Sequence, residues 1–206
     1  MAELSGKIGA IYATYGAGTA VSNEAVVLVA GVKSLAHTNV IVSKVTSDAG
    51  GTTPITKAWY CTVKGSLVVS NGGTATVYVT YKWWTAGTYG VANQIGVVAG
   101  FFGWGADQKG EPLQTTDYSD VGVRTYIPGL KGWTGSAEKH WITEVPLEWV
   151  GTKLIIKLYL DNVASPTLRY EGIGIITGHG VTSTVETLVN ESLSFQGDSV
   201  LTYEDT

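Results

Sequence analysis

The sequence predicts an all-β protein with many tight turns, and three features of its composition support this prediction. Glycine supplies 27 of the 206 residues, about 13% against a usual share of about 7%. Threonine and valine, which fit a pleated sheet, number 26 and 25, and eleven tyrosines and seven tryptophans accompany them. Charged residues make up only 15%, against roughly 25% in ordinary soluble domains. So little charge on so much β-forming sequence indicates a surface that other subunits cover in part.

The length and the single cysteine narrow the class of protein further. We expect one domain over residues 1–206, because the chain has the length of one ordinary domain. Cys61 is the only cysteine, so an intramolecular disulfide framework is excluded. No signal peptide is evident, and the longest apolar run, Ala25 to Val32, is too short to span a bilayer. These features predict a protein that is made in the cytoplasm and has no membrane segment.

Turn residues divide the first half of the chain into short strands. Residues 1–24 are predicted to form an N-terminal arm and the first strand, which covers Gly9–Tyr15. Further strands are predicted at Ala25–Val32 and Val40–Thr46, since both are short apolar or alternating runs between turn residues. Residues 47–53, rich in glycine, serine and threonine, are predicted to form a flexible loop.

The clearest local pattern lies between Ser66 and Trp84. A turn signal at Asn71-Gly72-Gly73 leads from a short strand into a longer one that ends at Trp84. Alternate residues of the longer strand form one apolar face (Val77, Val79, Tyr81, Trp83) and one more polar face (Thr76, Tyr78, Thr80, Lys82, Trp84). Trp83 and Trp84 therefore point to opposite sides of the sheet.

The second half of the chain contains one helix candidate and then a run of strands. Residues 142–151 are predicted to form a short α-helix, with Thr143 as its cap and Gly151 at its C-terminal end. Strands are expected throughout residues 153–203. In Lys153–Leu160 the even-numbered residues are predicted to face inward and the lysines outward, and later outward positions include Arg169, Glu171, Glu186 and Glu191.

No known catalytic pattern occurs in the sequence. The three histidines stand far apart without a cysteine cluster, and there is no P-loop or His-Glu-x-x-His motif. We therefore predict a protein that is not an enzyme and binds no cofactor or metal. The seven tryptophans either form a stacking platform for sugar rings, as in a carbohydrate-binding module, or pack in the core and at interfaces. The glycine-punctuated run Arg124–Ser136 reads, by spacing alone, as a strand–turn–strand corner.

Charge is distributed unevenly along the chain. Residues 1–100 carry six lysines and three acids, a balance of +3, whereas residues 101–206 carry seven basic residues and fourteen acids, a balance of −7. Residues 160–206 hold seven of these acids against Arg169 alone. An acidic segment of this kind is either a solvated surface or a functional one.

Several segments of the second half resemble the major tail proteins, or tail tube proteins, of long-tailed bacteriophages. The segments are Tyr126–Glu138, Leu154–Asp161, Arg169–Gly172, Ile175–Gly178 and Asn190–Asp198 followed by Leu201-Thr-Tyr203, and their order is similar to that of the family across residues 96–203. The positions that match the family motif are Pro128, Gly129, Gly132, Trp133, Gly135, Gly172 and Gly197. Residues 26–89 carry little that resembles the family.

This resemblance implies an antiparallel β-sandwich or barrel with one short flanking α-helix and a long loop. It also implies a structural virion protein that assembles into stacked hexameric rings around the tape-measure protein. Terminator and distal tail proteins would be further partners. Genomic DNA would later leave through the lumen without specific binding. The alternative is a tryptophan-rich carbohydrate-binding or decoration module of the virion.

The acidic C-terminal segment gains a physical interpretation from this resemblance. Acidic walls repel DNA and keep it mobile, whereas basic walls would bind its phosphates. We therefore predict that Glu171, Glu186 and Glu191 include residues that face the lumen. The loop at residues 47–53, through Asp48, Gly50, Gly51 and Thr52, is the predicted contact between successive rings.

Overall fold

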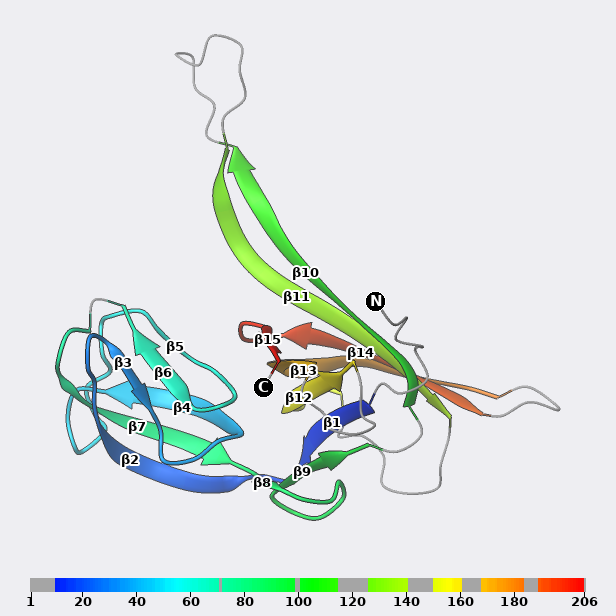
Figure 1. Cartoon of the computed structure of the whole chain (residues 1–206), viewed down its shortest axis with the longest axis horizontal. Coiled ribbons are helices and arrows are strands. Elements are labelled where there is room, and N and C mark those ends of the chain that lie inside the picture. The colour runs from blue at the N-terminus through cyan, green and yellow to red at the C-terminus, as the bar shows by residue number, and fades with distance from the viewer. Residues whose placement is uncertain are drawn as a thin grey trace, which may run out of the picture.

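The computed structural model of the chain describes residues 10–70, 72–98, 101–114, 126–140, 150–160, 168–183 and 189–205. These residues form fifteen β-strands joined by turns and contain no helix (Figure 1). The all-β prediction is therefore confirmed. The predicted helix at residues 142–151 falls almost wholly outside the described residues, of which only Val150 and Gly151 remain, in a turn.

Nine strands build one large sheet, which we call the body. Its order is β10-β11-β14-β13-β12-β1-β9-β8, with β15 paired to β13, and every pairing is antiparallel except that of β8 with β9. The bounds are β1 Ala10–Tyr15, β8 Thr85–Ala86, β9 Gln94–Val97, β10 Phe101–Gln114, β11 Tyr126–His140, β12 Lys153–Tyr159, β13 Arg169–Thr182, β14 Asn190–Gly197 and β15 Thr202–Glu204.

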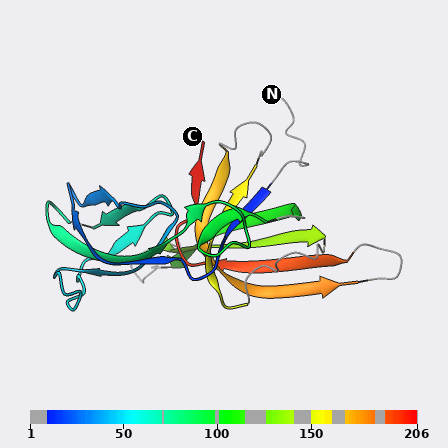
Figure 2. The same ribbon diagram turned by 90° about the horizontal axis from the view of Figure 1, so that it is seen from below.

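Residues 19–83 form a separate β-sandwich, which we call the lobe and which lies to one side of the body (Figures 1 and 2). Its two three-stranded sheets have the orders β2-β7-β4 and β3-β6-β5. The bounds are β2 Thr19–Val27, β3 Val32–Ser34, β4 Val40–Thr46, β5 Trp59–Cys61, β6 Ser66–Val69 and β7 Thr76–Trp83. Buried Leu28, Leu67, Val79 and Tyr81 belong to its own hydrophobic core.

The lobe interrupts the body between two neighbouring strands. Tyr15 at the end of β1 lies opposite Gln94 at the start of β9, and the first and last residues of the lobe, Thr19 and Trp83, also pair. Trp84 follows immediately and packs with Val63 against Ile155 of the body. Gly18 adopts a φ of +74°, and a Cβ there would lie 2.6 Å from the Trp84 ring. A side chain would thus disturb the junction of the two parts.

The alternation in β7 agrees with the sequence prediction. Val77, Val79 and Tyr81 are buried in the lobe core and Trp83 packs against it. Trp84 belongs to the junction cluster instead, so the adjacent tryptophans do serve different cores. The turn before β7 carries the chain from one sheet of the lobe to the other, because β6 pairs with β3 and β5 whereas β7 pairs with β2 and β4.

Three other predictions of strands need correction. The chain turns within the predicted strand Ala25–Val32, since β2 ends at Val27 and β3 begins at Val32. The part of Arg124–Ser136 that is described belongs to one long strand, β11, and not to a corner. In β12 both faces are covered: Leu154 and Ile156 pack in the body core, Ile155 packs at the lobe junction, and Leu160 is exposed.

The strands β10 and β11 form a hairpin that projects far beyond the rest of the body (Figure 1). β14 pairs with β11 only from Thr134 to His140, so the part of β11 before Thr134 pairs with β10 alone. Every residue of β10 from Gly105 to Gln114 is exposed. At about 3.4 Å per residue, its fourteen residues span about 45 Å.

Candidate functional site

The projecting hairpin presents a long exposed surface among the described residues. β10 is the terminal strand of the sheet and pairs, among the described strands, with β11 alone, so its other edge presents backbone groups to solvent from Gly105 to Leu113. Leu113 near its end is 55% exposed. An isolated two-stranded ribbon is at best marginally stable in water. The hairpin therefore has the geometry of a segment that another chain supports.

A groove lies between this hairpin and the lobe and has a volume of about 1250 Å³. One wall is the middle of the hairpin, from Gln108 to Gly110 and from Lys131 to Trp133. The opposite wall consists of strand β5 with part of β4, and the turn from Asp198 to Leu201 closes the groove between them. Tyr60 on β5 is 50% exposed and Val200 is exposed as well. The groove thus combines accessible apolar side chains with lysines.

Trp133 organises the base of the hairpin, and several positions of the family motif surround it. Its ring is buried, and its Nε1 donates a hydrogen bond of 2.7 Å to the backbone oxygen of Ser199. Glycines at 172 and 197 leave room for the ring, since a Cβ at Gly197 would lie 2.1 Å from Trp133 Nε1. Gly135 similarly makes room for Phe195, which packs edge-on against Trp133.

The remaining motif positions have different surroundings. Gly132 lies on exposed strand, where a Cβ would meet nothing within 4 Å. Pro128 and Gly129 belong to the outer part of β11, and Pro128 is paired with Pro112 of β10 beside an irregularity of register. The motif therefore contributes both to the base of the hairpin and to its projecting part.

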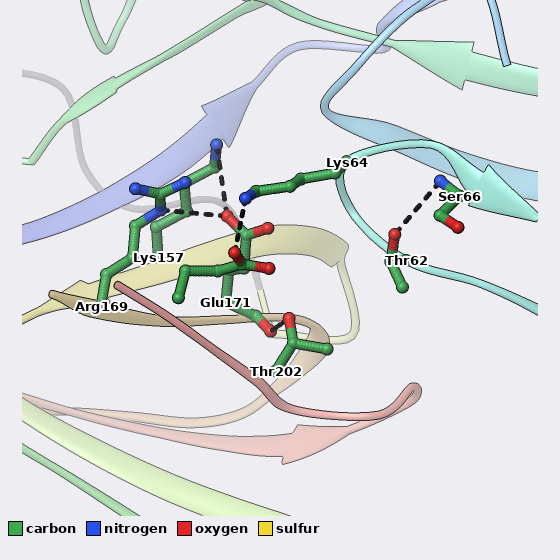
Figure 3. A network of polar contacts seen from close by, with 8 residues as sticks. Thr62, Lys64, Ser66, Lys157, Arg169, Glu171 and Thr202 are labelled. Atoms are coloured by element: carbon green, nitrogen blue, oxygen red, sulfur yellow. Dashed lines mark hydrogen bonds and ion pairs between the residues drawn. The ribbon is translucent and has the colours of Figure 1, made fainter. Parts of the chain in front are cut away.

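Glu171 lies at the centre of a network of charged side chains between the body and the lobe (Figure 3). Its carboxylate is 0% exposed; Oε2 accepts a hydrogen bond of 3.2 Å from Arg169 Nε and lies 3.6 Å from Lys157 Nζ. Nearby, Lys64 of the lobe pairs with Glu204 of β15 at 2.5 Å. Burial lowers the pKa of Lys157, and the Glu171 carboxylate opposes this effect. Oε1 of Glu171 has no partner among the described residues.

Glu191 is buried in a second ion pair within the body. The carboxylate is 3% exposed, with Lys139 Nζ at 2.7 Å from one oxygen and His179 Nε2 at 3.6 Å from the other. Lys139 stands opposite Glu191 in the register of β11 with β14. Burial lowers the pKa of the Lys139 ammonium.

These positions correct the prediction that Glu171 and Glu191 face outward. Because the lobe covers the second face of the central sheet, Glu171 is enclosed by its neighbours. Glu191 is enclosed with Lys139, so neither carboxylate lies on an accessible wall of the described chain. Glu186, the third acidic candidate for the lumen, lies outside the described residues.

The loop at residues 47–53 is a hydrogen-bonded turn. Asp48 accepts hydrogen bonds from the backbone N–H groups of Thr52 and Thr53, at 3.1 and 2.5 Å. These bonds lower the pKa of Asp48 to about 2. Lys44 donates to the backbone oxygen of Gly51, whose φ of +67° suits glycine. Gly50 and Thr52 are exposed on this turn, whereas Gly51 is buried. The turn is therefore closed by its own contacts.

A buried chain of polar contacts in the lobe has no counterpart among the sequence predictions. Tyr81 donates its hydroxyl proton to Glu24, and His37 Nδ1 lies 2.8 Å from the same hydroxyl oxygen. The His37 ring stacks on Trp83, with centroids 4.2 Å apart. Burial raises the pKa of Tyr81 well above its usual value. Only the tertiary structure joins these residues, and Tyr81 and Glu24, for example, are 57 positions apart along the chain.

No platform of exposed tryptophans exists in the described part of the chain. Trp84 and Trp133 are buried, Trp59, Trp83 and Trp104 are half-buried, and the two others lie outside the described residues. The same part of the chain holds no group of three histidine, cysteine or acidic side chains that could bind a metal ion. Among the described residues, no helix is long and apolar enough to cross a membrane.

Comparison with known proteins gives a limited result. No protein-family model matches the chain, and no curated protein matches its sequence. The chain is similar to one in the tail of an empty gene transfer agent particle with C6 symmetry, at 14% identity and a TM-score of 0.40, covering 53% of this chain and 86% of that one. It is also similar to one in the virion of a native gene transfer agent particle, at 14% identity and a TM-score of 0.41, covering 55% and 91%. Scores at this level do not by themselves show a shared fold.

Proposed function

We propose that this chain is a structural virion protein that assembles through its projecting hairpin into the tail tube of a phage-like particle. The observation that carries the proposal is the hairpin itself: the edge of β10 from Gly105 to Leu113 is exposed and pairs with no second described strand, and β14 pairs with β11 only from Thr134 onward. Such an edge is a template for pairing with another chain. A protein of this kind reaches its stable state in an assembly.

The resemblance of residues 96–203 to major tail proteins indicates the kind of assembly. We propose stacked hexameric rings that enclose the tape-measure protein and later conduct the genome, with terminator and distal tail proteins at the ends of the tube. The low content of charged residues, 15%, agrees with a subunit that neighbours cover on several sides. No further chemistry by the chain is needed for this role.

Two predicted contacts remain part of the proposal. Of the three acidic residues assigned to the lumen, Glu171 and Glu191 are buried in ion pairs, and Glu186, which lies outside the described residues, is the one that we retain as the lumen candidate. The turn of Asp48, Gly50, Gly51 and Thr52 remains a candidate for contact between rings. Because this turn is closed by its own hydrogen bonds, it would present a fixed surface.

The experiment is to purify the protein, measure its mass in solution over a range of concentrations and image it by negative-stain electron microscopy. We expect hexameric rings or polymerised tubes. A chain that stays monomeric at every concentration would refute the proposal. Retention of that monomer on glycan columns would instead support a carbohydrate-binding module.

A further inference from the structure

The groove between the hairpin and the lobe is a surface that the described residues of the chain leave open. Its lining includes two aromatic side chains of β5, Trp59 and Tyr60, and the exposed Val200. Exposed apolar surface in a concave site marks a place for a partner. The lobe supplies one wall and the hairpin the other, so an occupant would touch both parts of the subunit at once.

The groove carries positive charge. Three lysines line it, Lys109, Lys131 and Lys153, against one acid, Asp198, which gives a balance of +2. Asp198 pairs with Lys153 at 2.6 Å, and Lys109 pairs on the exposed hairpin with Asp107 at 3.0 Å. Lys131 is the groove lysine that no described carboxylate pairs with, and together with the apolar lining it favours an occupant with acidic and apolar side chains.

The chain contains a segment with that chemistry, which we call the outer hairpin and define as residues 111–130. It carries three acids, Glu111, Asp117 and Asp120, against Arg124, a balance of −2. Its described residues Glu111 and Leu113 are exposed. No other described element pairs with β10 or with the first part of β11. The described part of β10 in the outer hairpin is exposed, and the charge of the outer hairpin is opposite to that of the groove.

We infer that the groove of one copy receives the outer hairpin of a second copy. This inference rests on the proposed function, since it names the surface through which the subunits associate. Hairpin and groove are different patches of the same molecule, so the contact is heterologous and joins copies head to tail. Contacts of this type close into rings or continue as open filaments, which suits a tube. The lobe thereby takes part in assembly as one wall of the receiving site.

Charge reversal tests the inference with a matched control on each side. We expect Lys131→Glu in the groove and Glu111→Lys on the outer hairpin each to raise the concentration needed for half-assembly about tenfold. The chain with both reversals should recover most of the loss. Two control variants should assemble as the unaltered chain does. They are Lys82→Glu, on an exposed strand of the lobe outside the groove, and Glu138→Lys, at the base of the hairpin.

Crosslinking supplies a second readout that does not depend on the strength of assembly. In a Cys61→Ser background, chains with only Tyr60→Cys are mixed with longer, tagged chains that carry only Leu113→Cys. We expect a disulfide-linked heterodimer under mild oxidation, and none when Lys82→Cys replaces Tyr60→Cys.

The outcomes separate the inference from the proposed function. If the unaltered protein assembles but neither reversal weakens assembly, or if the two reversals add instead of compensating, the inference is wrong and the proposed function stands. If no heterodimer forms in tubes that do assemble, another segment fills the groove and the inference is again wrong. If the unaltered chain never assembles, the proposed function fails.

Discussion

The contact between Gly197 and Trp133 gives the sharpest prediction about the stability of this fold. Gly197→Ala would place a Cβ 2.1 Å from Trp133 Nε1 and 2.3 Å from its Cδ1. Carbon atoms in contact lie about 3.5–4.0 Å apart, so the ring or the strand would have to move by more than about 1 Å. The ring cannot move freely because Gly172 and Phe195 pack against it.

Gly197→Ala has two destabilising effects on the fold and one smaller stabilising effect. Overpacking of a core costs about 1–3 kcal/mol, and loss of the 2.7 Å hydrogen bond from Trp133 to Ser199 would leave a buried donor, at about 1–3 kcal/mol. Replacing glycine by alanine restricts the unfolded chain and returns about 0.4–1 kcal/mol. We expect a net loss of about 2–4 kcal/mol in the free energy of unfolding.

The assay is urea unfolding followed by tryptophan fluorescence, at a concentration below that of assembly. With a slope of about 2 kcal/mol per molar urea, a loss of 3 kcal/mol lowers the midpoint by about 1.5 M. Gly132→Ala is the control, because a Cβ there meets nothing within 4 Å. It should leave the midpoint unchanged or raise it slightly. Equal midpoints for both variants would refute the packing argument.

Three further predictions concern ionisable groups. Asp48 should titrate near pH 2 by NMR. Because its pKa is lower in the folded state than in the unfolded state, its stabilisation of the turn is present above about pH 4 and disappears as the pH falls through 2. In Asp48→Asn this loss of stability in acid should vanish. Glu171→Ala should lower the free energy of unfolding by about 3–5 kcal/mol, because it removes the carboxylate beside the largely buried ammonium of Lys157; a loss below about 1 kcal/mol in chemical denaturation would contradict this. Burial raises the pKa of the Cys61 thiol to about 12, so alkylation at pH 8 should be slow in the native protein and fast in urea, and equal rates would show that the thiol is accessible.

The sequence predicted the local structure well in strands of which only one face is buried. In β7 the apolar residues at alternate positions pack in the lobe core, as their spacing indicates. The prediction failed for β12, where Ile155 is as well buried as its neighbours. A strand between two others in a large sheet has two faces to cover, and no local pattern reveals what covers the second.

The charged residues show even more clearly that a local pattern does not reveal which face of a strand is covered. Glu171 stands at an alternating position that reads as outward, and its acidic neighbourhood suggests an exposed wall. The lobe, inserted some hundred positions earlier in the chain, places Lys64 beside the network and closes that face. Burial of a carboxylate with its cations is a tertiary event, because the partners come from three different strands and a turn.

What the sequence determined by itself is the all-β class, the positions of most strands and the scarcity of charge that indicates a covered subunit. These follow from composition and from alternation with a period of two, which are local properties. The tertiary structure decided that residues 19–83 separate into a lobe, that β10 and β11 continue as an unsupported hairpin, and that a positively charged groove lies between them. Those features depend on which strands pair although they lie far apart in the sequence. Such pairing is decided by the burial of the apolar face of a whole sheet, which no local pattern reveals. We propose that the hairpin and the groove are the surfaces through which neighbouring subunits cover a chain with so little charge.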